Sequence, residues 1–268
     1  MDPSLRNQRA TSFGAVADAY ERTRPGYPSE ARQWLVGESP AKILELGAGT
    51  GKLTSDLRDD GHDVIPVDPS ADMLKTLRKR LKGHPAVRAV AERIPLRTSS
   101  VDVVVAAQAY HWFDLDLTLP EISRVLRPGG RLALVWNTRD ESVPWVKKLT
   151  RIIGAEPVEE DPVERLDEIG LYDGIETKTF RHWQQVDRDS LLGLVESRSH
   201  VASLGEQERR DLLEQVGAMY DDYGRGHDGM LLPYLTSCFR ARVSSTGKLL
   251  REGTGEPGLD DGLLIDFS

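Results

Sequence analysis

Three glycines, Gly47, Gly49 and Gly51, lie within five positions directly after the apolar run KILEL. Glycine adopts positive φ values and lets a ligand approach the backbone closely. An acid, Asp68, ends the next apolar run, DVIPVD, where a carboxylate can accept hydrogen bonds from both hydroxyls of a ribose. The spacing therefore predicts a site for a ligand that carries a nucleoside.

Three interpretations of this loop compete. A dinucleotide fingerprint has the spacing G-x-G-x-x-G, but here the spacing is G-x-G-x-G and Lys52 stands where the last glycine belongs. A phosphate loop needs G-K-[ST] after a longer gap, but here Leu53 follows Lys52. A nucleoside loop without a phosphate fits best, and a purely structural turn is the alternative that stays open.

His111 lies in the segment YHWFD, which directly follows the apolar run VDVVVAAQA. Imidazole titrates near pH ~6.5, so it can act as a general base at neutral pH. If the apolar run is a strand of the sheet that carries the glycine loop, His111 lies beside the reacting group. The alternative is that His111 and Trp112 only shape the floor of a pocket.

Apolar runs alternate with helical patterns along this part of the chain. Because such runs are typical of strands buried on both faces of a parallel sheet, we predict strands at residues 42–46, 63–68, 86–92, 101–109 and 131–137. Strands that alternate with helices at this spacing imply an α/β fold with right-handed crossovers. The glycine loop then lies at the carboxyl edge of the sheet, where open α/β folds bind ligands.

The composition argues against several classes of function. The net charge of −8 is unlike that of a nucleic-acid binder, and the basic run at residues 77–85 is interpreted as the solvent-facing side of a helix. The chain lacks an apolar run of ~18 residues and a signal-peptide pattern. A single cysteine, Cys238, fits a reducing cytoplasm, and the six histidines lack metal-ligand spacing. We therefore expect a cytoplasmic protein without a metal, membrane or nucleic-acid partner.

Four segments together carry a family resemblance. They are ILELGAGTG, FGAVADAYERTRPGYP, AERIPLRTSSVDVVVAAQAYHWF and LRPGGRLALVWN. In this order they resemble class I S-adenosylmethionine-dependent methyltransferases over nearly the whole chain. The first-helix and HWF segments are most similar to the small-molecule branch that includes trans-aconitate methyltransferase-like proteins. The resemblance implies a Rossmann-like, doubly wound sheet of seven strands, mostly parallel, whose last strand, at residues 235–243, runs antiparallel.

The resemblance also implies a donor site for S-adenosylmethionine, with S-adenosylhomocysteine as the product. Asp68 would hold the ribose, and Gln108 would lie beside the sulfonium. Val90 stands where relatives often carry an aspartate that recognises the adenine amino group, so Glu92 or backbone groups would replace it. The residues around the methionine part would be Glu45, Gly47, Ala48, Gly49 and Gly51, and those around the adenine would be Pro69, Met73, Ala91 and Glu92.

The remaining parts of the chain follow from this assignment. We expect a helical cap at residues 1–40, the donor-binding core at 41–137, acceptor-pocket helices with the final strands at 138–243, and a disordered tail at 244–268. Tyr20 and Arg24 share one face of a helix in the cap, and Arg24 could pair with the donor's carboxylate if this helix closes as a lid. An ordinary surface arginine is the alternative.

The expected function is methyl transfer to a small-molecule acceptor by a monomer or homodimer. Two other functions stay open: a catalytically silent regulatory protein that binds S-adenosylmethionine, and a nucleic-acid methyltransferase. The acidic charge disfavours the latter, as does the absence of an N-P-P-Y-like motif after residue 109.

Overall fold

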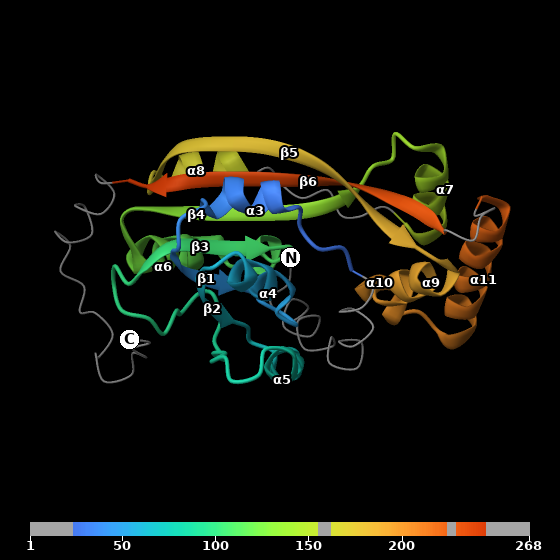
Figure 1. The fold of residues 1–268 in the computed structure, drawn as a ribbon, viewed down its shortest axis with the longest axis horizontal. Helices are drawn as coiled ribbons and strands as arrows, with labels where there is room; N and C mark the ends of the chain where they lie inside the picture. Colours follow the sequence, from blue (N-terminus) through green and yellow to red (C-terminus); the bar gives the residue numbers. More distant parts are fainter. Residues whose placement is uncertain (1–23, 155–161, 224–228, 245–268) are drawn as a thin grey trace. The chain divides into compact units, whose positions relative to one another are not determined.

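The computed structural model describes residues 24–154, 162–223 and 229–244 (Figure 1). The predicted lid residue Tyr20, most of the predicted cap and all of the tail after Ser244 lie outside these ranges. The described strands form one mixed sheet in the order β2-β1-β3-β4-β6-β5. Their bounds are β1 Lys42–Leu46, β2 Asp63–Val67, β3 Val101–Ala107, β4 Leu126–Arg139, β5 Tyr172–Val186 and β6 Met230–Val243.

The parallel part of the sheet is built on β1, which pairs with β2 on one side and with β3 on the other. Ile43, Leu44, Glu45 and Leu46 of β1 are all buried. A central parallel strand is covered on both faces, which explains why every buried position of β1 except Glu45 is apolar. Because β1 and β3 pair in parallel, their carboxyl ends lie at the same edge of the sheet, and β4 continues the parallel part on the other side of β3.

The last strand, β6, lies between β4 and β5 and runs antiparallel to β4. The backbone N–H of Asp140 donates to the carbonyl oxygen of Pro233, and the hydroxyl of Thr138 donates to that of Leu235. The residue numbers rise along one strand as they fall along the other, which is the antiparallel pattern. The predicted antiparallel last strand is therefore confirmed, with a start five residues earlier than expected.

The sheet has six described strands, so the prediction of seven was wrong. The segment at residues 86–92 forms only an isolated parallel bridge, between Val87 and Val67. Val87 exchanges two hydrogen bonds with the end of β2, while Val90 is 46% exposed. Beyond this bridge, side chains of a helix bind the backbone groups at Ile94 and Leu96.

The helix α5 illustrates how the sequence sets the packing of the helices. Met73, Leu74 and Leu77 are buried on one face, while the lysines and arginines lie on the other, as predicted for the basic run. The Ser70 side chain caps this helix by accepting a hydrogen bond from the backbone N–H of Met73. The described helices are α3 Ser29–Val36, α4 Lys52–Asp59, α5 Ala71–Arg80, η2 Tyr110–Trp112, α6 Leu115–Val125, α7 Pro144–Ile153, α8 Pro162–Ile169, α9 Arg188–Glu196, α10 Ser199–Ala202 and α11 Glu206–Tyr223.

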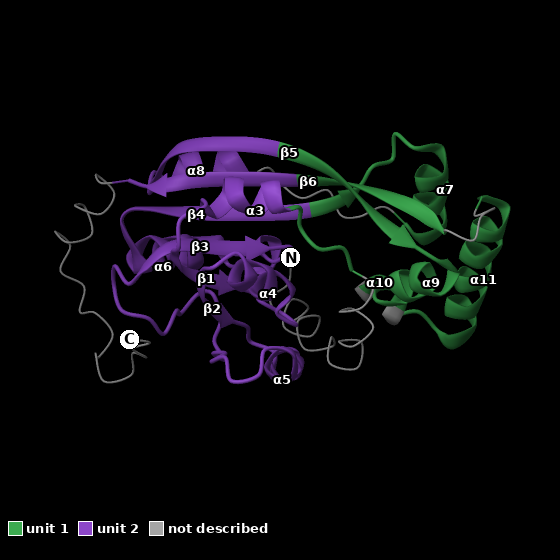
Figure 2. Ribbon diagram, in the orientation of Figure 1, with its two compact units in different colours: residues 1–28, 137–158, 179–236 green, residues 29–136, 159–178, 237–268 purple. Residues whose placement is uncertain are grey.

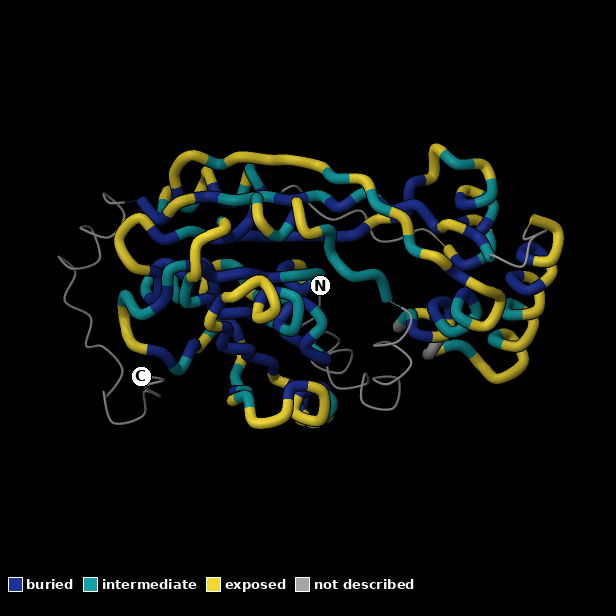
Figure 3. The backbone as a smooth tube through the Cα atoms, in the orientation of Figure 1, coloured by how far each residue is buried: buried dark blue, intermediate teal, exposed yellow. Residues whose placement is uncertain are grey.

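The chain divides into two compact units, shown in different colours in Figure 2. The larger unit comprises residues 29–136, 159–178 and 237–268, and the smaller comprises residues 1–28, 137–158 and 179–236. Each unit has its own apolar core, and β4, β5 and β6 contribute residues to both units. Figure 3 shows that β5, at the edge of the sheet, is largely exposed. Within the described ranges, no helix is both long and apolar enough to cross a membrane.

Candidate functional site

The glycine loop joins β1 to α4 in the larger unit, and its glycines have positive φ angles of 69° at Gly47, 56° at Gly49 and 80° at Gly51. A Cβ atom at Gly47 would lie 2.5 Å from the Cβ of Ala109, and one at Gly51 would lie 2.8 Å from Cγ of Leu77. At Gly49 a Cβ would meet no atom within 4 Å. Gly47 and Gly51 therefore serve packing, whereas Gly49 faces open space that a ligand can use.

Asp68 is tied to this loop. One carboxylate oxygen accepts a hydrogen bond from the backbone N–H of Gly49 at 2.9 Å, and the other accepts one from Ser70 at 2.8 Å. Burial raises the pKa of Asp68 above its ordinary value, although the two backbone N–H groups act in the opposite direction. The structure thus brings together the glycine loop and the strand-end acid that the sequence indicated.

Glu45 lies on β1 and is 1% exposed. The hydroxyl of Thr54, on the first turns of α4, donates a hydrogen bond of 2.5 Å to its carboxyl group. Burial raises the pKa of Glu45 to about 8, so the carboxyl group holds a proton at neutral pH as long as no cation binds beside it. A cationic ligand group at this carboxyl would instead favour the charged form, which makes Glu45 a ready partner for an ammonium.

The end of β3 adjoins the glycine loop through Ala109, which is the residue that a Cβ at Gly47 would strike. Gln108 has a φ of 54°, a left-handed conformation that is unusual outside glycine. Its backbone N–H donates to the carbonyl oxygen of Val135 at 2.9 Å, which helps to hold that strained conformation in place. Strained residues of this kind concentrate at functional sites.

His111 follows on the 3₁₀ turn η2 and is exposed. Its ring lies 4.7 Å from that of Trp112, at an interplanar angle of 48°. On the same turn, Tyr110 is buried and packs edge to face against Trp136. Tyr110 therefore anchors the turn in the core, while His111 projects from it.

The segment predicted to flank an adenine is held by contacts that the sequence analysis did not anticipate. Ala91 and Met73 are buried, whereas Pro69 is exposed. The Glu92 carboxylate accepts a hydrogen bond of 3.0 Å from the backbone N–H of Asp114, just before α6. Glu92 is thus bound to the start of α6 in this structure.

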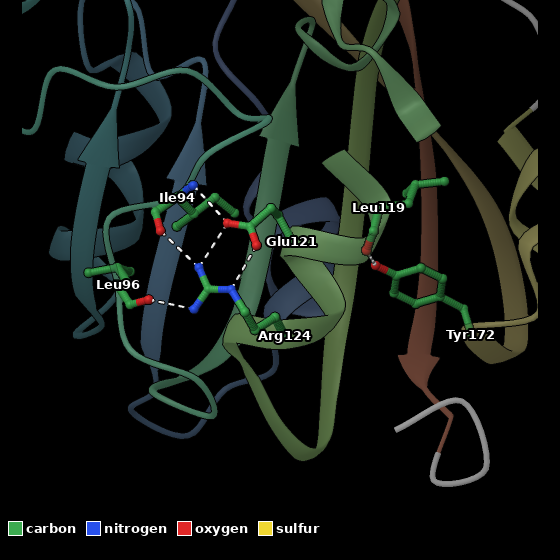
Figure 4. A network of polar contacts seen from close by, with 6 residues as sticks. All are labelled: Ile94, Leu96, Leu119, Glu121, Arg124 and Tyr172. Atoms are coloured by element: carbon green, nitrogen blue, oxygen red, sulfur yellow. Dashed lines mark hydrogen bonds and ion pairs between the residues drawn. The ribbon is translucent and has the colours of Figure 1, made fainter. Parts of the chain in front are cut away.

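Two side chains of α6 fix the backbone that follows this segment (Figure 4). Glu121 accepts a hydrogen bond from the backbone N–H of Ile94 at 3.0 Å. Arg124 donates to the carbonyl oxygens of Leu96 at 2.7 Å and Ile94 at 2.9 Å, and it forms an ion pair with Glu121 at 2.7 Å. We call Glu121 and Arg124 the α6 clamp. Their spacing in the sequence indicates only a helical pair, so sequence patterns alone carried no signal for this role.

The predicted lid is not brought to this site by the described contacts. Arg24 is the first described residue and belongs to the smaller unit, whereas the glycine loop belongs to the larger one. Tyr20 lies outside the described residues. Their proposed action on a ligand therefore stays a prediction.

Comparisons with known proteins agree with this geometry. A family model described as a methyltransferase domain matches residues 44–134. An uncharacterised methyltransferase of Mycobacterium tuberculosis is 43% identical over 245 residues, which cover 89% of this chain and 98% of that protein. The solved structure of a protein from Anaeromyxobacter dehalogenans, described as a putative type II methyltransferase, matches with a TM-score of 0.60 at 26% identity, over 82% of this chain and 97% of that one.

A second solved structure shares the fold. It is phosphoethanolamine N-methyltransferase 2 of Haemonchus contortus in complex with phosphomonomethylethanolamine and S-adenosylhomocysteine. It matches with a TM-score of 0.54 at 17% identity, over 91% of this chain and 61% of that one. The chain therefore belongs to the class I S-adenosylmethionine-dependent methyltransferases, and S-adenosylmethionine is its methyl donor.

Proposed function

We propose that the protein transfers the methyl group of S-adenosylmethionine to a small-molecule acceptor, a metabolite or a natural-product intermediate. The observation that carries the donor part of this proposal is the Gly49 N–H bound to the Asp68 carboxylate, beside space that no side chain of the loop fills. The acidic net charge of −8 supports an acceptor other than a nucleic acid.

The residues present fit the donor. Glu45 would pair with the ammonium of the donor's methionine part, because a cation beside this buried carboxyl group would stabilise its charged form. Asp68 would accept hydrogen bonds from the ribose, and Gly49 would let the donor lie against the backbone. Gly47, Ala48 and Gly51 complete the loop, and Gln108 would flank the sulfonium.

The adenine would lie between Met73 and Pro69 on one side and Ala91 on the other. Since Glu92 already accepts a hydrogen bond from Asp114, we assign recognition of the adenine amino group to backbone groups of this segment. This choice between the two alternatives left open by the sequence rests on that contact. The α6 clamp would hold the following backbone in place while the donor binds.

S-adenosylmethionine, when bound, supplies an electrophilic methyl group whose leaving group is a neutral thioether. The protein's own contribution is then to align the acceptor and exclude water. An acceptor that carries a proton at neutral pH also needs a base, and we propose His111 for that role because it projects from the turn after β3. A carboxylate acceptor would need no base.

Several finer expectations belong to this proposal. The small-molecule branch that resembles trans-aconitate methyltransferase-like proteins, a cytoplasmic location and a monomer or homodimer are all retained. The thiol of Cys238 is buried, with its pKa raised to about 12 by that burial, so we expect it to be chemically inert.

A screen with methyl-labelled donor tests the proposed function. Phenols, alcohols, amines and carboxylic acids are offered in separate reactions, with duplex DNA and transfer RNA as additional substrates, and S-adenosylhomocysteine is measured. We expect turnover with one chemical class of small molecules. Methylation of the nucleic acids alone would contradict the proposal, and donor binding without any turnover would favour the regulatory alternative.

A further inference from the structure

Three arginines lie on one face of the sheet within the larger unit. Arg131 is on β4, and Arg240 and Arg242 are on β6, which neighbours β4 in the sheet. Successive side chains of a strand point to opposite faces of its sheet. Because Leu132 of β4 and Ala241 of β6 pack into the apolar core on one face, the three arginines lie on the other face.

Arg240 is bound within the protein through all of its side-chain nitrogens. Nε and Nη2 donate to the two carboxylate oxygens of Glu176 on β5, at 3.2 Å and 2.8 Å. Nη1 donates to the carbonyl oxygen of Trp34 at 2.7 Å, and Cζ lies 4.3 Å from the centroid of the Trp34 ring. These contacts hold the end of α3 against this face of the sheet (Figure 1). Arg240 therefore supplies a fixed positive charge.

Arg131 and Arg242 differ from Arg240 in this respect. Among the described residues, neither side chain has a hydrogen-bond or ion-pair partner. Arg242 is exposed, whereas Arg131 is half-buried. Burial lowers the pKa of Arg131 below its ordinary value, and the charges of Arg240 and Arg242 lower it further. Like charges on neighbouring strands destabilise a sheet, so this arrangement has a cost that an anion would remove.

The charges around Arg131 indicate which anion fits. Of the described carboxylates, Glu176 is the one that acts on Arg131, and it also feels the charges of Arg240 and Arg242. Three guanidinium groups and one carboxylate leave an excess of two positive charges. A phosphate monoester carries about −1.5 to −2 charges at pH ~7 and has three acceptor oxygens. The planar fork of N–H donors on an arginine matches these oxygens in bidentate geometry.

These arginines lie away from the donor site of the same unit. Arg131 pairs with Val103, near the start of β3, whereas the glycine loop adjoins Ala109, just after the end of β3. At about 3.3 Å per residue, this part of the chain spans roughly 15–20 Å. An anion held by Arg131 therefore occupies a different site from the methyl donor.

We propose that Arg131 and Arg242 form a second binding site, which takes the phosphate group of a small molecule. Both side chains donate to the phosphate oxygens, while Arg240, held by Glu176 and Trp34, contributes its charge. Binding replaces the repulsion between the guanidinium groups by attraction to one shared anion, so the ligand stabilises the folded protein. Inorganic phosphate and a phosphate ester present the same chemistry, and the experiment separates these two sources.

The test uses the full chain and calorimetry with inorganic phosphate, glycerol 3-phosphate and acetate as probes, at constant ionic strength. Arg131→Gln and Arg242→Gln each remove one guanidinium group. Arg58→Gln is the matched control with the same change in charge, because Arg58 is an exposed arginine on α4 of the same unit.

We expect both phosphates to bind the parent protein, and acetate to bind at least about tenfold more weakly. Tighter binding of glycerol 3-phosphate would identify an ester as the natural ligand, and equal binding would identify free phosphate. Arg131→Gln and Arg242→Gln should each raise the dissociation constant of phosphate by about 10- to 100-fold, whereas Arg58→Gln should match the parent. The affinity for S-adenosylhomocysteine should stay unchanged in all three variants. A parent protein that binds neither phosphate would overturn the inference, as would an equal loss in Arg58→Gln.

The melting temperature gives a second readout through a double-mutant cycle. In buffer without phosphate, Arg242→Gln should raise the melting temperature of the parent, because it relieves the repulsion with Arg131. In the Arg131→Gln background the same substitution should have little effect. With saturating phosphate, Arg242→Gln should instead lower the melting temperature of the parent. If Arg242→Gln had the same effect with and without phosphate, the two arginines would not share an anion and the inference would be wrong.

Discussion

The backbone N–H of Gly49 donates a hydrogen bond of 2.9 Å to the carboxylate of Asp68, nineteen residues further along the chain. The contact links the loop after β1 to the end of β2 at Gly49, the one of the three loop glycines at which a Cβ atom would meet open space. A second backbone N–H, from Ser70, holds the other oxygen. The donor site is therefore preorganised, with its acid already aimed by two backbone groups.

Replacing Asp68 tests its proposed role toward the ribose. Asp68→Ala should weaken the binding of S-adenosylhomocysteine by about 1–3 kcal/mol, the scale of lost hydrogen bonds to a charged group. Calorimetry measures the effect, and Asp59→Ala serves as control because Asp59 is an exposed acid at the end of α4. Equal affinity in both variants would mean that the ribose is held elsewhere.

The glycines should separate stability from binding. Gly49→Ala introduces a left-handed alanine that costs about 1–2 kcal/mol but meets no neighbour. Gly47→Ala has a similar backbone cost and also strikes Ala109, so it should melt at a clearly lower temperature. We expect Gly49→Ala to remain folded yet to lose donor affinity by at least about tenfold, because its methyl group occupies the donor's space. Thermal denaturation measures the melting temperatures, and calorimetry measures the donor affinities. Normal donor binding by Gly49→Ala would contradict the prediction.

The buried Glu45 should make the stability of the ligand-free protein depend on pH. Its pKa is raised from 4.5 to about 8, so the folded state retains a proton that the unfolded state releases. The contribution of this raised pKa to the folded state's stability is complete below pH 4.5 and is lost as the pH rises through about 8. Glu45→Gln should therefore gain melting temperature relative to the parent as the pH increases across this window. A difference in melting temperature between the two proteins that does not change with pH would show that the pKa of Glu45 is not raised.

The same group should release a proton when the donor binds. An ammonium beside Glu45 favours the carboxylate, so binding of S-adenosylmethionine near pH ~7 should expel protons in the parent. Calorimetry in buffers of different ionisation enthalpy detects this release, which Glu45→Gln should abolish. Binding enthalpies that do not depend on the buffer in the parent would place the ammonium away from Glu45.

The α6 clamp should affect donor binding without contacting the donor. Arg124→Met leaves the carbonyl groups of Ile94 and Leu96 without their guanidinium partner, so the segment becomes disordered for part of the time. The apparent dissociation constant of the donor then rises in inverse proportion to the fraction of molecules whose segment is ordered for binding. We expect a rise of about tenfold in this constant. Faster amide hydrogen exchange at residues 91–96 should accompany it. Arg127→Met is the control, because Arg127 forms an ion pair with Asp102 on the surface.

His111→Gln tests the proposed base directly. Glutamine keeps a polar side chain of similar reach but cannot take up a proton, so kcat should fall by about 10²–10⁴-fold with an acceptor that carries a proton. Affinity for S-adenosylhomocysteine should stay near that of the parent. Near-full activity of this variant with such an acceptor would assign His111 to the shape of the pocket.

The sequence predicts the donor-binding part of the fold well because its signals are local. The apolar run KILEL gave the bounds of β1 as observed, and the glycines gave the loop that follows it. The acid at the end of the second run directly follows β2, and its carboxylate accepts a hydrogen bond from Gly49, a contact that the sequence did not predict. For β1 and for the loop after it, the residues that determine the structure lie within a few positions of one another, whereas the contact of Asp68 with Gly49 spans nineteen residues.

The features that the sequence analysis missed all depend on partners far along the chain. The alternation at residues 86–92 resembles a strand, but Glu121 and Arg124 take the backbone groups that follow it. Likewise, nothing near His182 indicates that its ring meets Thr236, which is 54 residues away. Such pairs are set by the order of strands in the sheet, which apolar patterns do not encode.

The position of β6 also determines when the fold can be completed during synthesis on the ribosome. In the described sheet, β6 lies between β4 and β5. It is the only neighbour of β5, and it covers the edge of β4 that β3 leaves open. Three described helices, α9, α10 and α11, separate β5 from β6 along the chain, so both earlier strands are synthesised well before the strand that joins them. Until β6 leaves the exit tunnel, the nascent chain therefore has one open edge on β4 and two on β5, and a second nascent chain can pair with them.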